Sequence, residues 1–283
     1  MAEITAEAVK KLRDRTGMQM MKCKEALVKA NGDMERAVEE LRKHNKEAQD
    51  KAASRETAEG RIGIYIDAAQ KIGSIVELRC ESAPVAKSDL FIKLANDLAK
   101  HVAVTGATSA EAMLAQKFVD KPSQTIHERI GEVVGLIKEN MKPARAAKLT
   151  GLLGSYIHHD GSTGVLLQVE GKDTADAQLL RDAALHVTAA RPQYARRQDV
   201  PAERVAKEKE IAVAQIAADP KNANKPPQIM EKIAEGKLKT WYAENVLTDQ
   251  PFVKDDSKSV GDLLKVAGLK VVRFVRYKVG ELS

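Results

Sequence analysis

The 283-residue chain has few aromatic residues, few cysteines and no long apolar run. Phe, Trp and Tyr make up 4% of it, so it offers few rings on which nucleic-acid bases could stack. Two cysteines cannot form a disulfide framework, and no run approaches the roughly 20 apolar residues that span a bilayer. The acidic start Met-Ala-Glu-Ile-Thr-Ala-Glu is unlike a signal or transit peptide. We therefore expect a cytoplasmic protein with no membrane partner.

Signatures of catalysis are missing as well. The sequence has no Gly-x-x-x-x-Gly-Lys-Ser/Thr phosphate loop, no Gly-x-Ser-x-Gly elbow and no His-Glu-x-x-His zinc motif. His158-His159-Asp160 suggests a metal site, but adjacent side chains on a strand face opposite ways. We expect a protein that is not an enzyme and that uses neither a metal nor another cofactor.

Charge is abundant but balanced, with 46 Lys and Arg against 40 Asp and Glu. Residues 1–60 contain 13 basic and 12 acidic residues and no aromatic one. A nucleic-acid-binding surface concentrates its positive charge, so no direct nucleic-acid contact is expected. An alternative stays open: a ribosome- or RNA-associated protein that binds through the basic strand residues Arg273, Arg276 and Lys278.

Three short helices are predicted over residues 1–45. Thr5 and Asp33 are suitable helix caps, while Thr16-Gly17 and Asn31-Gly32 interrupt the apolar periodicity. Residues 46–60 are polar and lack an apolar period, so we interpret them as a linker that includes some helix. The N-terminal module should then fold apart from the rest, and its deletion should leave the remainder folded.

An internal repeat follows the linker and predicts two related halves of the type strand, strand, helix. Gly63-Ile-Tyr65 matches Gly154-Ser-Tyr156 at an offset of 91 residues, and the match continues through Gly73 and Gly164. The helices then match through His101 and His186. Each half has one apolar face to bury, so the two halves should pack together. We assign residues 61–150 to the first half, and 151–198 and 243–283 to the second.

Residues 199–242 interrupt the second half. Apolar residues recur there at helical spacing, which predicts an antiparallel helical hairpin before a last strand over residues 271–279. Such an insertion is a candidate for a protruding arm through which two copies form a homodimer. The fold class is therefore α+β.

Several stretches together resemble elongation factor Ts. They are Leu12–Leu27 followed by Asn31-Gly32-Asp33, then Cys80-Glu-Ser-Ala-Pro-Val85-Ala86-Lys87, Tyr156-Ile-His158, and Leu247–Val253. The resemblance implies an N-terminal module like a ubiquitin-associated (UBA) domain, a core of two related subdomains and a coiled-coil insertion. It also implies the activity: such proteins bind the GTPase EF-Tu and promote GDP release without covalent chemistry.

The resemblance further implies which residues touch EF-Tu. Ser82, Ala83, Pro84 and Val85 correspond to the loop that displaces magnesium in the family, and the other implied contacts are Arg13, Thr16, Gly17, Met20 and His158. The family motif usually reads Thr-Asp-Phe-Val-Ala-Lys, whereas Ala83 and Pro84 stand here in place of Asp and Phe. A relative that binds EF-Tu without exchange activity is therefore a further alternative. An ordinary structural reading is also open, in which Pro84 marks a turn, Gly17 ends a helix and Met20 packs inside.

Overall fold

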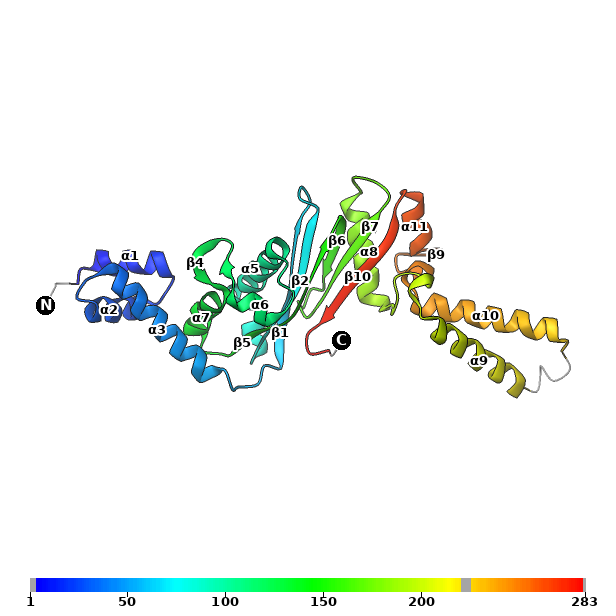
Figure 1. Cartoon of the computed structure of the whole chain (residues 1–283), viewed down its shortest axis with the longest axis horizontal. Coiled ribbons are helices and arrows are strands. Elements are labelled where there is room, and N and C mark those ends of the chain that lie inside the picture. The colour runs from blue at the N-terminus through cyan, green and yellow to red at the C-terminus, as the bar shows by residue number, and fades with distance from the viewer. Residues whose placement is uncertain (1–3, 220–224, 282–283) are drawn as a thin grey trace.

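The computed structural model describes residues 4–219 and 225–281. The molecule is elongated: a helical module lies at one end, two sheets with their helices form the middle, and two helices project at the other end (Figure 1). Helices and strands are both abundant, so the predicted α+β class is correct.

Three helices form the N-terminal module: α1 (Ala6–Thr16), α2 (Met20–Lys29) and α3 (Met34–Ala52). Both predicted caps are present, because Thr5 accepts a hydrogen bond from the backbone N–H of Ala8 and Asp33 accepts from those of Glu35 and Arg36. The helices enclose a small apolar core of their own, whose buried members are Val9, Leu12, Met18, Cys23, Ala26, Leu27, Ala30, Ala37 and Leu41.

Within residues 46–60, which we interpreted as a linker that includes some helix, α3 continues without a break to Ala52 and the first strand begins at Glu59. The C-terminal part of α3 packs against α7 (Ile126–Ile137) at two glycines. A Cβ atom added at Gly135 would lie 2.1 Å from Oδ1 of Asn45, so a larger side chain would push the helices apart. The module is thus docked on the core through small residues of another element, which the polar composition of α3 does not reveal.

The first half contains a three-stranded antiparallel sheet in the order β1-β2-β5, covered on one face by helices. Beneath these helices lies the largest apolar cluster, which includes Phe91, Leu94, Ile130 and also Ala52 of α3. The elements are β1 (Glu59–Asp67), β2 (Ile72–Cys80), α4 (Ala83–Ala86), α5 (Asp89–Thr105), α6 (Ala110–Ala115), β3 (Lys117–Phe118), β4 (Lys121–Thr125), α7 and β5 (Met141–Thr150).

The second half repeats this order around a sheet β10-β7-β6. Its core lies between the sheet and the helices α8 and α11, with Leu167, Leu180 and Leu264 buried. The elements are β6 (Leu152–Ile157), β7 (Thr163–Glu170), α8 (Ala177–Ala190), a 3-10 turn (Arg197–Asp199), α9 (Ala202–Ala218), α10 (Pro227–Asn245), a second 3-10 turn (Leu247–Asp249), β8 (Pro251–Phe252), β9 (Asp255–Ser259), α11 (Val260–Val266) and β10 (Lys270–Lys278).

Glycines explain why the repeat is visible in the sequence. A Cβ atom added at Gly63 would lie 2.3 Å from the carbonyl oxygen of Ala95, and one added at Gly154 would lie 2.8 Å from that of Leu180. In both halves, therefore, the helix approaches the strand too closely for any side chain. The repeat also extends further than predicted: Gln116-Lys-Phe-Val and Gln250-Pro-Phe-Val begin equivalent short hairpins.

The two sheets pack against each other through an apolar layer of Ile62, Ile75, Leu149, Leu153 and Leu166. A backbone hydrogen bond also joins the halves, from the N–H of Ile62 to the carbonyl oxygen of Gly161 (2.9 Å). Each sheet therefore has helices on one face and the other sheet on the opposite face.

A buried carboxylate lies at this junction. Glu77 of β2 accepts from Nε of Arg145 (2.6 Å) and from the backbone N–H of Gly280 (3.0 Å). The Arg145 guanidinium lies 4.3 Å from the centre of the Tyr277 ring and donates to the carbonyl oxygen of Lys278. This network connects β2 and β5 of the first half with the C-terminal end of β10 in the second.

The helices α9 and α10 pack against each other, and residues 220–224 between them lie outside the described residues. Ala212, Ile216 and Ala234 are buried between the two helices, whereas Ile229 is exposed. At the base, Nε2 of Gln250 donates to the carbonyl oxygen of Glu244 at 2.8 Å, which anchors the end of α10 to the core.

Each half contains one buried histidine at an equivalent position. His101 and His186 are fully inaccessible and pair with Gln116 and Gln250 at 2.9 and 3.0 Å. Nδ1 of His186 accepts the backbone N–H of Val253, so Nε2 carries the proton and donates to Gln250. Burial lowers the pKa of both histidines, although their glutamine partners oppose the shift.

We therefore expect the protein to lose stability in mild acid. In the unfolded chain both histidines bind a proton as the pH falls below about 6.5, while the folded chain resists protonation until a lower pH. The stabilisation that these histidines contribute is complete above that pH. It is lost as the pH falls through their lower pKa values in the folded protein. The urea concentration at the unfolding midpoint should decrease as the pH is lowered from 7 to 5. The decrease should be smaller for the double variant His101→Gln with His186→Gln than for the control variant His127→Gln, in which an exposed histidine is replaced. Equal slopes would contradict the assignment.

Candidate binding surface

The residues implied by the family resemblance occupy three separate places. Arg13, Thr16, Gly17 and Met20 lie at the corner between α1 and α2, Ser82–Val85 follow β2, and His158 follows β6. Figure 1 shows α1 and α2 at one end of the molecule and β6 in the middle. A partner that touched all three would have to extend along much of the molecule.

The turn after β2 is held in place by hydrogen bonds to the connection between α7 and β5. Ser82 donates from its backbone N–H (3.0 Å) and its hydroxyl (2.5 Å) to the carboxylate of Glu139. The preceding Glu81 accepts from the backbone N–H of Asn140 and pairs with Arg55 at 3.2 Å. These bonds fix the backbone of the turn on the α7–β5 connection, so the residues that follow are presented on a rigid support.

Ala83 and Pro84 begin the one-turn helix α4, and both are exposed. Val85 is half-buried against the core and Ala86 is buried. The tip therefore presents only the methyl group of Ala83 and the pyrrolidine ring of Pro84. It has neither a carboxylate that could act on a partner's metal ion nor an aromatic ring that could insert into the partner. Leu90, which is 45% exposed at the start of α5, is a nearby apolar residue that the sequence reasoning missed.

The corner between α1 and α2 is shaped by Thr16 and Gly17. The Thr16 hydroxyl donates to the carbonyl oxygen of Leu12 (2.7 Å), and Gly17 caps α1 in the left-handed region at φ 69°. Only the backbone angle demands glycine here, since a Cβ atom at this position would meet nothing within 4 Å. Both residues therefore have structural roles, while the Arg13 side chain is exposed.

Beyond this corner, α2 presents an apolar face to solvent. Met20 is 42% exposed, so the reading in which it packs inside is wrong, and Met18 is buried instead. Met21 (65% exposed) and Val28 (51% exposed) lie within the same third of the helix circumference as Met20. These two residues were missed, although their spacing places them opposite the buried Cys23 and Ala26. Exposed methionines suit contact with another protein because their side chains adapt to its shape.

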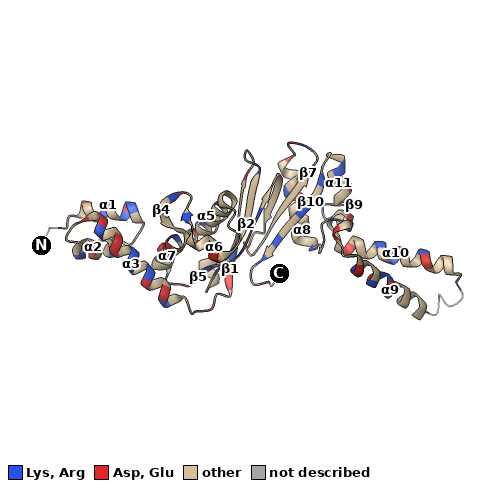
Figure 2. Cartoon of the chain, viewed as in Figure 1, with Lys and Arg blue, Asp and Glu red and all other residues tan. Residues whose placement is uncertain are grey.

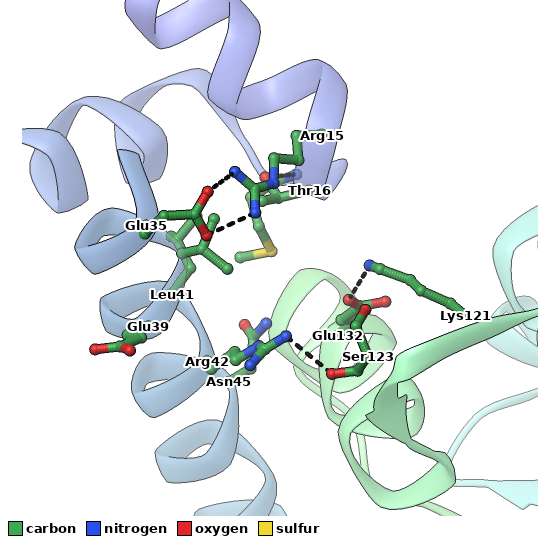
Figure 3. A pocket seen from close by; sticks show the side chains of 12 residues that line it. Arg15, Thr16, Glu35, Glu39, Leu41, Arg42, Asn45, Lys121, Ser123 and Glu132 are labelled. Atoms are coloured by element: carbon green, nitrogen blue, oxygen red, sulfur yellow. Dashed lines mark hydrogen bonds and ion pairs between the residues drawn. The ribbon is translucent and has the colours of Figure 1, made fainter. Parts of the chain in front are cut away.

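A cavity of about 310 Å³ separates the module from the core (Figure 3). On the module side Arg15 pairs with Glu35 through two hydrogen bonds, and across the cavity Arg42 donates to the carbonyl oxygen of Ser123 at 3.3 Å. Lys121 pairs with Glu132 on the opposite wall. Because these charged side chains already have partners within the protein, they are not available to hold a ligand. The hydrogen bond from Arg42 to Ser123 instead connects the module with the core.

His158 begins the turn between β6 and β7, where its backbone N–H donates to the carbonyl oxygen of Thr163 at 2.9 Å. Its ring lies 4.3 Å from that of His159 and lines a cavity of about 380 Å³ beside α8. Within residues 4–219 and 225–281 no group of three His, Cys, Asp or Glu side chains could hold a metal ion.

The basic residues of β10 do not form a single row. Arg273 bonds Gln168 at 2.9 Å, whereas Arg276 pairs with Glu281 and lies on the opposite face of the strand, because strand side chains alternate. Figure 2 shows basic and acidic residues interspersed along the molecule. A continuous track for a phosphate backbone is thus absent from this strand.

Both cysteines, Cys23 and Cys80, are buried. Burial raises the pKa of Cys23, and it raises that of Cys80 to about 12. Since the thiolate is the reactive form, neither residue is a candidate nucleophile.

Comparison with known proteins places the chain in a family. The family model for Elongation factor TS matches residues 81–281. Elongation factor Ts of Pasteurella multocida (strain Pm70) is 45% identical over 282 residues, which cover 99% of this chain and 93% of that protein. The Methylococcus capsulatus protein of the same name is 41% identical, with 98% of this chain and 92% of that protein covered. The Aquifex aeolicus (strain VF5) protein is 37% identical, with 99% of each covered.

These matches identify a translation elongation factor. More narrowly, the chain belongs to the elongation factor Ts family. In the described part of the chain, no helix has the length and apolar character needed to cross a membrane.

Proposed function

We propose that this protein binds EF-Tu in the cytoplasm and accelerates GDP release by stabilising nucleotide-free EF-Tu. The observation that carries the proposal is the turn Ser82–Val85: in a chain of this family, its exposed tip sits on a backbone fixed by Glu139 and Asn140. A rigid projecting turn can occupy a space in EF-Tu that opens only when the nucleotide site is distorted. A mobile turn would lose conformational entropy on becoming ordered, and this loss would weaken its binding.

Exchange of this kind requires no covalent step and no cofactor. If the factor weakens GDP binding by some ratio, GDP must weaken binding of the factor by the same ratio. Contacts that fit both states of EF-Tu equally add affinity but release nothing. We assign the affinity to the α2 face with Met20 and Arg13 and to the turn at His158, and the discrimination between states to Ala83 and Pro84.

Titration calorimetry tests the proposal through this linkage. The affinity for nucleotide-free EF-Tu should be high and should fall as GDP and Mg²⁺ are added, while stopped-flow release of labelled GDP should accelerate with protein concentration. Binding that is unaffected by GDP would indicate a partner without exchange activity, and would refute the proposal. The homodimer through residues 199–242 stays a prediction.

A further inference from the structure

A basic cavity lies where α8 ends, between this helix and the sheet of the second half. It is the cavity of about 380 Å³ that His158 lines, and we call it the α8 cavity. Arg191, the C-terminal cap of α8, lines it from the helix side. Arg276 and Lys278 line it from β10, on the same face of the strand as Phe274. Three cations from two elements thus converge on one hollow.

The positive charge of the α8 cavity is only partly compensated. Arg276 is 87% buried as a side chain, since 13% of it is exposed; it pairs with Glu281 at 2.6 Å, but its Nε is buried without a partner. No carboxylate of residues 4–219 and 225–281 lies within ion-pair distance of Arg191 or Lys278. Asp160 also lines the cavity, but it accepts the backbone N–H and hydroxyl of Ser162 within its own turn.

The first half shows that the fold does not need two of these cations, Arg191 and Lys278. Gly106 caps α5 as Arg191 caps α8: both are left-handed, and their N–H groups bond the equivalent carbonyls of Val102 and Val187. The strand registers likewise pair Ile72 with Thr150 and the equivalent Thr163 with Lys278. Gly106 and Thr150 therefore stand in the first half where the second half has Arg191 and Lys278, and Asp67 stands where the second half has His158. At the position of Arg276 the first half keeps a cation, Lys148.

Clustered like charges oppose folding, so two added cations that only one of two equivalent halves carries point to a ligand. We propose that the α8 cavity receives a carboxylate side chain of a protein partner, held by Arg191, Arg276 and Lys278. This inference rests on the proposed function, which supplies EF-Tu as that partner. Guanidinium groups match carboxylates in shape as well as charge, and the burial of Arg276 strengthens its attraction for a carboxylate, while Arg191 and Lys278 are exposed.

A protein side chain fits the α8 cavity better than a nucleic acid. The hollow is large enough for one or two side chains, whereas a phosphate backbone needs an extended basic surface. Arg273, the next cation along β10, lies on the opposite face of the strand and cannot extend the site.

The variant Arg191→Gly with Lys278→Thr tests the proposal, because it installs the residues that the first half carries at the same positions. Glycine also suits the left-handed angle of residue 191, at φ 49°. We expect affinity for nucleotide-free EF-Tu to fall about tenfold or more, with a weaker dependence on salt. The matched control, Lys172→Gly with Lys270→Thr, removes two exposed lysines near the far end of the same sheet and should change affinity less than twofold.

Carbodiimide cross-linking gives a second measurement. It should join the Lys278 amine to an Asp or Glu of EF-Tu in the wild-type complex. If the test and control variants bound EF-Tu with equal affinity and equal salt dependence, the role proposed for the α8 cavity would be overturned, while the proposed function would stay in place. If the test variant lost binding to a labelled tRNA but kept its affinity for EF-Tu, the proposal would also be overturned, in favour of a nucleic-acid ligand. Failure of the wild-type protein to bind EF-Tu at all would overturn both proposals.

Discussion

Glu77→Gln is expected to lower the free energy of unfolding by about 3 kcal/mol, because it removes the charge of a buried ion pair while leaving its partner buried. The Glu77 side chain is 3% exposed and that of Arg145 is 17% exposed, so water cannot replace the lost interaction. Arg145 would keep its contacts with the Tyr277 ring and the carbonyl oxygen of Lys278, but without a counter-charge. The effect should be global, because these residues connect the two halves.

Urea unfolding at neutral pH measures this loss, with Glu35→Gln as the matched control. Glu35 also forms two hydrogen bonds with an arginine, Arg15, but its side chain is 73% exposed, and such pairs contribute about 1 kcal/mol or less. Replacing both partners, by Glu77→Leu with Arg145→Met, should cost less than the sum of the single changes, since the Arg145 charge is removed together with its counter-charge. Arg79, which also pairs with Glu77 at 3.7 Å, is 28% exposed and keeps access to water. Equal losses for Glu77→Gln and Glu35→Gln would show that the network does not hold the halves together.

Local chemistry made part of this fold predictable. Thr5 and Asp33 cap their helices because a side-chain oxygen next to free backbone N–H groups has the same use in any fold. The repeat was visible because Gly63 and Gly154 each lie under a helix that leaves no room for a side chain. These residues report on their immediate surroundings, so sequence alone suffices.

The remaining features depend on contacts between elements distant in the sequence. The docking of α3 on α7 rests on Gly131 and Gly135, more than 80 residues further along the chain than Gln49 and Asn45, which they contact. Neither end of that contact has a distinctive local pattern, so residues 46–60 looked like a linker. The candidate site shows the same limit. Pro84 could be found by resemblance, but the exposure of Met21, Val28 and Leu90 emerges only when the helices are packed.

The docking of α3 also changes what truncation would do. Deleting residues 1–45 would remove Asn45 from the Gly135 surface and expose Leu136, which packs against the core of the module. The truncated protein would therefore lose more than an independent domain. Single substitutions on the surface of the module, such as Arg13→Ala, separate binding from folding more cleanly.

Ala83→Asp with Pro84→Phe is expected to accelerate GDP release about thirtyfold on an EF-Tu that has evolved with the usual family motif, since an aromatic side chain filling a pocket is often worth ~2 kcal/mol. The structure favours such a gain because both side chains point into solvent from a backbone that Ser82 fixes through Glu139. The new side chains would therefore be displayed without repacking the core. Thermal unfolding of the variant should match the wild type.

The partner determines the sign of the effect on the cognate EF-Tu. If that EF-Tu retains the pocket, the variant releases GDP faster there too; if its pocket has adapted to a proline, the added ring obstructs the complex and release slows. Stopped-flow measurements on both EF-Tu proteins separate these cases. The matched control Ala68→Asp with Ala69→Phe places the same residues in the exposed β1–β2 turn and should alter neither rate. Equal rates for wild type and the Ala83/Pro84 variant on both partners would mean that the nucleotide site is opened by some other part of this surface.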